Sequence, residues 1–293
     1  MPTGELMKPA PFDYHRPTSL AETFDLLDTY GDDGRLLAGG QSLVPALNMR
    51  LAAPRAVIDI NRLPGLADIR STAEGLEIGA LTRHEAVERS PLVASHAPLL
   101  AAAMRYVGHP VIRTRGTVGG SLALADPAAE LPACAVALDA AIRVSSRRGD
   151  RRIAAADFFR GVYTTALEAG EVLTALVVPR RGVGTRSAID ELARRHGDFA
   201  LAGLAAQARV DDGVLAEVRL VFFGVGVAPV RARGAERAVT GRRPDADGVA
   251  TAAAAALEAD LHPSGDIHAS PDVRRQLARV LLSRVVRRLG EGR

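Results

Sequence analysis

The chain has 293 residues, enough for about two domains, and its 47% apolar content is typical of globular proteins. Its 37 lysine and arginine residues nearly balance its 34 acidic residues, and no basic stripe with interleaved aromatic residues predicts a nucleic-acid surface. The single cysteine, Cys134, excludes an internal disulfide, a four-cysteine zinc site and an iron–sulfur cluster held by this chain alone, so we expect no metal in it.

In chain order, the first predicted elements are short helices and strands. Leu20, Phe24 and Leu27 recur at helical spacing, which predicts a helix over 18–30. Apolar runs predict buried strands at 35–38 and 56–60. A helix is predicted between them, over 43–51, with Ser42 placed to cap its first turn.

The next stretch is richer in strands. They are predicted at 76–80, 141–145, 151–154 and 171–178, with helices at 98–107 and 130–138. Thr82 and Glu85 have the spacing of a capping box, which predicts a helix start. Cys134 falls in an apolar run, where we expect a buried structural thiol rather than a nucleophile.

A polar, glycine-rich stretch at 180–186 predicts a domain boundary. Beyond it, Asp211-Asp212-Gly213 joins two strand-like runs, 201–210 and 214–223, as a hairpin. Three helical stretches follow, near 231–240, 245–260 and 271–289. Together these elements predict an α+β fold without the strict alternation of a doubly wound sheet.

Two glycine-centred segments are the most informative part of the sequence. The first consists of Ala38, Gly39, Gly40, Gln41 and Ser42, and the second of Thr117, Val118, Gly119, Gly120 and Ser121. Successive backbone N–H groups in such turns form anion-binding nests, and glycine lets a phosphate approach the backbone. Neither segment has the lysine of a P-loop or the spacing G-x-G-x-x-G. Two nests in one domain favour a diphosphate held from both sides, as in a dinucleotide.

Further motifs, together with these segments, carry a resemblance to one family. They are Pro11-Phe12-Asp13-Tyr14, Arg115-Gly116, Ala125-Asp126-Pro127-Ala128-Ala129-Glu130-Leu131-Pro132, Phe158-Phe159-Arg160-Gly161-Val162-Tyr163-Thr164-Thr165 and Arg194-Arg195-His196-Gly197-Asp198-Phe199-Ala200. From end to end, the sequence resembles the FAD-binding medium subunit of molybdenum hydroxylases. That family includes aerobic carbon monoxide dehydrogenase and the flavin domain of xanthine dehydrogenase.

The resemblance implies a fold and a domain organisation. Residues 1–180 would form an α+β FAD-binding domain of the vanillyl-alcohol-oxidase/murein-reductase (PCMH) type, with subdomains at about 1–60 and 61–180. Residues 185–293 would form a small C-terminal α+β domain of the carbon monoxide dehydrogenase flavoprotein type, with an antiparallel sheet and helices. This division agrees with the boundary predicted near residue 180.

The resemblance also implies a non-covalently bound FAD. By position, its diphosphate would be wrapped by Ala38, Gly39, Gly40, Gln41, Ser42, Thr117, Gly119, Gly120 and Ser121. Glu130 would bind the adenosine ribose. The sequence departs from the family pattern at three places: Ser121 replaces an asparagine, Thr114-Arg115 replaces Arg-Asn, and Glu130 replaces an aspartate. Gln41 stands where carbon monoxide enzymes carry histidine, which favours another substrate class.

In such a family the cofactor performs the chemistry, so no catalytic residue is expected in this chain. Electrons would arrive from the [2Fe–2S] clusters of a small subunit, fed by a molybdopterin large subunit that binds the substrate. They would leave the FAD for a quinone, oxygen or NAD. The implied assembly is a dimer of heterotrimers. No apolar run reaches the roughly 18 residues of a membrane span, so we expect a cytoplasmic protein.

Two other functions remain open at this point. A stand-alone FAD oxidoreductase of the same fold class would need its own substrate pocket and acid–base residues. A non-catalytic assembly or nucleotide-binding protein would carry no flavin.

Four residues outside the glycine segments have two interpretations each. His109 is a loop histidine or a covalent flavin attachment point. Tyr163 and Phe199 belong to the core or cover the isoalloxazine ring. Asp198 orients the C-terminal domain against the flavin or pairs with a neighbouring arginine.

Overall fold

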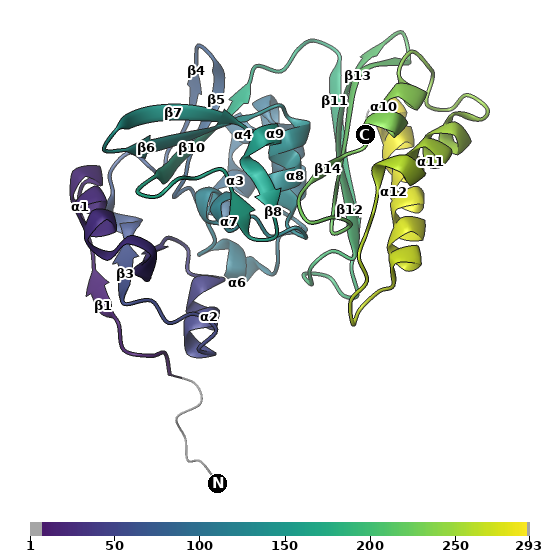
Figure 1. Cartoon of the computed structure of the whole chain (residues 1–293). Coiled ribbons are helices and arrows are strands. Elements are labelled where there is room, and N and C mark those ends of the chain that lie inside the picture. The colour runs from purple at the N-terminus through teal and green to yellow at the C-terminus, as the bar shows by residue number, and fades with distance from the viewer. Residues whose placement is uncertain (1–7, 292–293) are drawn as a thin grey trace.

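The computed structural model describes residues 8–291, and its first unit is a small parallel sheet with the strand order β1-β3-β2 (Figure 1). The elements of this unit are β1 (Asp13–His15), α1 (Leu20–Tyr30), the 3-10 turn η1 (Gly31–Asp33), β2 (Gly34–Leu37), α2 (Leu43–Asn48), β3 (Ala56–Asp59) and the 3-10 turn η2 (Ile60–Arg62). The Ser19 hydroxyl caps α1 by accepting a hydrogen bond from the Glu22 N–H at 3.2 Å. The predicted helix over 18–30 is confirmed.

Two predicted helix caps are wrong. The Ser42 side chain makes no capping hydrogen bond, and its carbonyl oxygen instead accepts from the Ala46 N–H at 3.1 Å. The Thr82 hydroxyl faces the carbonyl oxygen of Asp68, so α3 begins after Arg83 without a capping box. At Thr82, a contact with a neighbouring segment overrides the local sequence signal.

The second unit is an antiparallel sheet with the strand order β4-β5-β10-β6-β7. Its strands are β4 (Ile69–Thr72), β5 (Gly75–Gly79), β6 (Ala141–Ser146), β7 (Gly149–Ala154) and the central β10 (Val172–Pro179). The helices of this unit are α3 (His84–Arg89), α4 (Pro91–His96), α5 (Pro98–Ala103), α6 (Pro110–Arg113), α7 (Val118–Leu124) and α8 (Glu130–Ala137). The short α9 (Ala155–Phe158) leads into a small β-ribbon of β8 (Phe159–Gly161) and β9 (Thr164–Thr165). Cys134 of α8 is fully buried, as predicted.

The third unit is an antiparallel sheet with the strand order β11-β12-β13-β14, covered by the three C-terminal helices (Figure 1). It comprises β11 (Thr185–Leu192), β12 (Ala202–Asp211), β13 (Val214–Phe223), β14 (Val230–Arg231), α10 (Arg233–Val239), α11 (Val249–Asp260) and α12 (Pro271–Glu291). The predicted hairpin is confirmed: Asp211 pairs with Val214, and Asp212 and Gly213 have φ values of 47° and 82°.

The third sheet is buried on both faces. Ile189, Ala205 and Phe223 share a hydrophobic core with α8 of the second unit. Leu204 and Phe222, one residue away along the strands, belong to the core beneath α12. This period-2 alternation places the sheet between the second unit and its own helices. The α+β prediction is confirmed, and no helix within residues 8–291 is long and apolar enough to cross a bilayer.

Candidate cofactor-binding site

The structure packs the first glycine segment against the backbone that leads into the second one. A Cβ atom on Gly39 would lie 2.5 Å from the carbonyl oxygen of Arg115 and 2.9 Å from the Cα atom of Gly116. Only glycine permits this approach between two backbones. A Cβ atom on Gly120 would lie 4.0 Å from the Cβ atom of Ala38, so these two residues also face one another.

The first segment keeps its backbone donors unused. Within residues 8–291, no hydrogen bond is donated by the backbone N–H groups of Gly39, Gly40, Gln41 and Ser42. Gly40 has a φ of 75°, a left-handed conformation that glycine adopts without strain. The carbonyl oxygens of Gly40 and Ser42 are occupied, because they accept from α2. A run of unpaired N–H groups beside a positive-φ glycine has the character of an anion-binding nest.

The second segment differs from the sequence expectation, because it has no free nest. Its glycines lie in the first turn of α7, and the Thr117 hydroxyl caps that helix by accepting from the Gly120 N–H at 3.1 Å. The N–H groups of Val118 and Gly119 donate to the carbonyls of Thr82 and Ala80, at 3.0 and 2.8 Å. The Ser121 N–H donates within the turn. This segment therefore offers hydroxyl groups and space rather than free amides.

Asn61 and Arg83, two residues that the sequence analysis missed, connect the segments. The Asn61 Nδ2 atom donates to the Ala38 carbonyl at 2.8 Å and to Asp59 Oδ1 at 2.6 Å. Arg83 donates from Nη2 to Asn61 Oδ1 at 2.7 Å and from Nη1 to the Arg115 carbonyl. Their sequence positions carry no glycine or motif signal, so only the three-dimensional structure reveals this bridge.

His84 packs against Gly116, in the backbone that leads into the second segment. It is buried, and a Cβ atom on Gly116 would lie 2.8 Å from its Nδ1 atom. Burial lowers the pKa of His84 to about 4, so the ring is neutral at pH 7. A neutral, packed imidazole here fixes the backbone just before α7.

Glu130 lies at the start of α8, and it faces the third unit. Burial, reinforced by the charge of Asp126, raises the pKa of the Glu130 carboxyl to about 7. Burial also raises the pKa of Glu191, on β11, to about 8, with contributions from the charges of Glu130 and Asp190. The sequence analysis missed Glu191. No hydrogen bond within residues 8–291 connects Glu130 to either glycine segment.

The two aromatic candidates are not core residues. Tyr163 and Phe199 are 62% and 70% exposed, so the core interpretation is wrong for both. Tyr163 adopts a φ of 51°, and its hydroxyl lies 3.4 Å from Asp126 Oδ2. Two large exposed aromatic faces are available to cover a planar ligand.

His109 and Asp198 lie on neighbouring loops. A Cβ atom on Gly197 would lie 2.8 Å from the Cε1 atom of His109, so the His109 ring packs on this glycine. Asp198 forms no ion pair within the described residues, so its predicted pairing with a neighbouring arginine is wrong. In the part of the chain that the structure describes, no three His, Cys, Asp or Glu side chains are grouped as metal ligands would be.

Two family models together match nearly the whole chain. Residues 10–181 match the model described as the FAD binding domain in molybdopterin dehydrogenase. Residues 187–289 match the model described as the CO dehydrogenase flavoprotein C-terminal domain.

Curated relatives align over most of their length. The chain is 39% identical to the 6-hydroxypseudooxynicotine dehydrogenase complex subunit alpha of Paenarthrobacter nicotinovorans, covering 96% of this chain and 95% of that protein. It is 35% identical to the carbon monoxide dehydrogenase medium chain of Hydrogenophaga pseudoflava, covering 96% and 97%.

Solved structures share the fold over the same extent. The carbon monoxide dehydrogenase from Hydrogenophaga pseudoflava superposes with a TM-score of 0.93 at 37% identity, covering 96% of this chain and 98% of that one. Quinoline 2-oxidoreductase from Pseudomonas putida 86 superposes with a TM-score of 0.92 at 36% identity, covering 98% and 99%.

Proposed function

The chain belongs to the family of FAD-binding medium subunits of molybdenum hydroxylases, and from this premise we propose how its residues hold the FAD. The unused N–H groups of residues 39–42 bind the diphosphate, because they form the run of free donors that an anion requires. This set of free donors is the single observation that carries the assignment. Glycine at position 40 gives this turn its positive φ, and glycine at position 39 permits the close backbone contact that holds the turn against residues 115 and 116.

The second glycine segment closes the same site from the other side. Gly120 leaves space opposite Ala38, and the Ser121 hydroxyl can donate one hydrogen bond to a phosphate or ribose oxygen. Thr117 holds the turn in place through its cap on Gly120. Glu130 binds the adenosine ribose, and Tyr163 and Phe199 cover the isoalloxazine ring.

Bound FAD supplies the capacity to take electrons one at a time from iron–sulfur clusters and pass them to an acceptor. This chain's residues bind it, orient it and exclude water, and no general acid or base is assigned among them. The chain is thus the FAD-carrying electron-transfer subunit of a multi-subunit molybdenum hydroxylase.

The assembly and the domain division are part of the proposal. A small subunit with [2Fe–2S] clusters and a molybdopterin large subunit complete a dimer of heterotrimers in the cytoplasm. Residues 1–180 form the FAD-binding domain, with subdomains at about 1–60 and 61–180, and residues 185–293 form the C-terminal domain. The separate sheets formed within residues 13–59, 69–179 and 185–231 support this division.

Acid precipitation of the purified protein tests the cofactor assignment. The supernatant should contain FAD, identified by chromatography, because no covalent bond to the chain is expected. Flavin that stays with the pellet, FMN in place of FAD, or no flavin at all would each contradict it.

Affinity purification of the chain from its native host tests the assembly. Two further polypeptides should co-purify, together with iron, acid-labile sulfide and molybdopterin. A lone flavoprotein that oxidises a substrate at full rate would instead favour the stand-alone oxidoreductase.

A further inference from the structure

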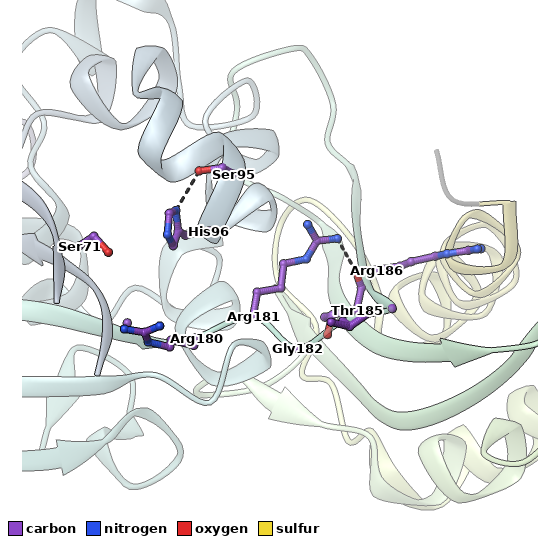
Figure 2. Close-up of a pocket in the computed structure, with 11 residues that line it drawn as sticks. Ser71, Ser95, His96, Arg180, Arg181, Gly182, Thr185 and Arg186 are labelled. Carbon is purple, nitrogen blue, oxygen red and sulfur yellow. Dashed lines mark hydrogen bonds between the residues drawn. The ribbon is translucent and has the colours of Figure 1, made fainter. Parts of the chain in front are cut away.

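A cavity of about 660 Å³ lies at the junction between the second and third units, outside both glycine segments (Figure 2). Its polar lining includes Ser71, Ser95, His96, Arg180, Arg181 and Thr185. These residues come from β4, from α4, from the segment that joins β10 to β11 and from the first residue of β11. The cavity is therefore bounded by both units.

The charge of this cavity is positive and uncompensated. Among the described residues, no aspartate or glutamate lines it. Within residues 8–291, neither Arg180 nor Arg181 forms an ion pair. Asp211 lies 3.9 Å from the position of a Cβ atom on the lining residue Gly184, and it already pairs with Arg209. Glu74, next to the lining residue Gly75 in sequence, pairs with Arg152. Unpaired guanidinium groups in a concave site attract anions.

The head groups that face the cavity are held in place by the backbone. Arg180 donates from Nε to the Ala73 carbonyl at 3.1 Å and from Nη2 to the Thr72 carbonyl at 3.4 Å, and its other guanidinium N–H groups remain for a ligand. Arg181 donates to the carbonyl of Thr185. The Nδ1 atom of His96 lies 3.1 Å from the carbonyl oxygen of Leu92, and its Nε2 atom has no partner within residues 8–291.

Arg186 is different, although it also lines the cavity. Its side chain points away toward the end of α12 (Figure 2), where Nη1 donates to the Leu289 carbonyl at 3.1 Å. Arg186 thus supports the wall, and Arg180 and Arg181 provide the binding charge.

We propose that this cavity binds a small anion with two phosphate groups, such as a diphosphate. The volume is within the range of about 300–1,000 Å³ that is usual for small-molecule sites. Arg180 and Arg181 are spread along the cavity rather than directed at one point (Figure 2), which suits two anionic groups. Among the described residues that line it, His96 has the one aromatic ring and there is no tryptophan, tyrosine or phenylalanine, so the phosphates rather than a stacked nucleobase are recognised. Such a ligand would connect the two units.

Calorimetric titration of the FAD-loaded protein with inorganic pyrophosphate tests this site, in about 0.15 M salt to screen non-specific attraction. The R180Q/R181Q variant should bind at least tenfold more weakly than the unchanged chain. The control R233Q/R237Q removes the same charge from two exposed positions of α10 and should bind normally. If R180Q/R181Q loses its flavin, the titration is repeated with the single variant R181Q. Within residues 8–291 the Arg181 side chain bonds only to the carbonyl of Thr185, four residues along the chain.

Three outcomes would overturn the proposal. They are no saturable binding of pyrophosphate, equal weakening in both double variants, and equal affinity for orthophosphate and pyrophosphate. Pyrophosphate should also raise the unfolding temperature of the unchanged chain and leave that of R180Q/R181Q unaltered, since binding stabilises only the form that holds the ligand.

Discussion

Asn61 and Arg83 are joined by a hydrogen bond of 2.7 Å, and through it they set the distance between the two glycine segments. Asn61 binds the carbonyl of Ala38 in the first segment, and Arg83 binds the carbonyl of Arg115 just before the second. Burial, together with the nearby charge of Arg115, lowers the pKa of Arg83, but a guanidinium keeps its proton in proteins. The free N–H groups of residues 39–42 are thus positioned by a charged side chain from a different unit.

Replacing Arg83 should therefore weaken FAD binding without unfolding the chain. We expect R83A to raise the Kd for FAD roughly five- to thirtyfold, since a hydrogen bond to a charged group contributes about 1–2 kcal/mol at a partly exposed site. R83K should not restore affinity, because one ammonium group cannot reach both acceptors.

Fluorescence titration of the FAD-free chain measures these constants. R62A is the matched control, because Arg62 neighbours Asn61 and has no hydrogen bond to either segment within residues 8–291. Equal Kd values for R83A and R62A would remove the role assigned to Arg83.

The two glycines of the second segment should respond differently to alanine. A Cβ atom on Gly119 would lie 2.6 Å from the Cβ atom and 2.8 Å from the carbonyl oxygen of Ala80, so we expect G119A to destabilise the fold. A Cβ atom on Gly120 would meet only the Thr117 hydroxyl at 2.7 Å and reach toward Ala38. G120A should lose about 1 kcal/mol of stability, because the added methyl group displaces the capping hydroxyl of Thr117. It should also bind little FAD, because that methyl group enters the space opposite Ala38.

Thermal unfolding and flavin content, measured together, separate these effects. The expected pattern is a low unfolding temperature for G119A and a folded, flavin-poor G120A. A folded G119A with reduced flavin and a fully loaded G120A would reverse the two roles.

The sequence predicted which segments form the site better than how they work. Glycine spacing identified 38–42 and 117–121, and the structure packs the first segment against the backbone that leads into the second. The sequence could not show that the N–H groups of Val118 and Gly119 are already used by the carbonyls of Thr82 and Ala80, because these partners lie 36 and 39 residues earlier in the chain. Gly119, which the glycine pattern assigned to the diphosphate, is required by its packing against Ala80.

Long-range polar contacts were the other class that the sequence could not reveal. No functional motif identifies Asn61, Arg83 or Glu191, and the role of each depends on a partner on another element. The hairpin at Asp212-Gly213 and the helix α1 were predictable because turn chemistry and capping are local. The capping signal at Thr82 was local as well, but its prediction was wrong because the Thr82 hydroxyl donates to the carbonyl of Asp68 instead.

Glu191 should make the stability of the chain depend on pH. Its pKa is about 8 in the folded chain and 4.5 in an unfolded reference, so the folded state binds the proton more tightly. The stability from this proton is fully present below about pH 4.5 and is lost as the pH rises through about 8. E191Q should therefore match the unchanged chain near pH 4 and exceed it by about 1–2 kcal/mol near pH 9, a value reduced for partial exposure.

Urea unfolding at the two pH values gives this comparison. D157N serves as the control, because Asp157 is an exposed carboxylate on α9. An E191Q variant that is less stable than the unchanged chain near pH 9 would show that the Glu191 carboxylate has a stabilising partner.

Glu130 should give FAD binding its own pH dependence. The Glu130 carboxyl has a pKa of about 7, and an ionised carboxylate accepts a ribose hydroxyl more strongly than a protonated carboxyl does. FAD affinity should then rise as the pH increases from about 6 to about 8. E130Q cannot ionise, so its affinity should stay level across this interval. The Kd ratio of E130Q to the unchanged chain should grow from near one at about pH 6 to roughly five- to tenfold at about pH 8.

Titration of both proteins with FAD at each pH measures the ratio, and D157N controls for the loss of one charge. A ratio that is the same at both pH values would place the ribose away from Glu130 and leave its raised pKa to burial and the charge of Asp126.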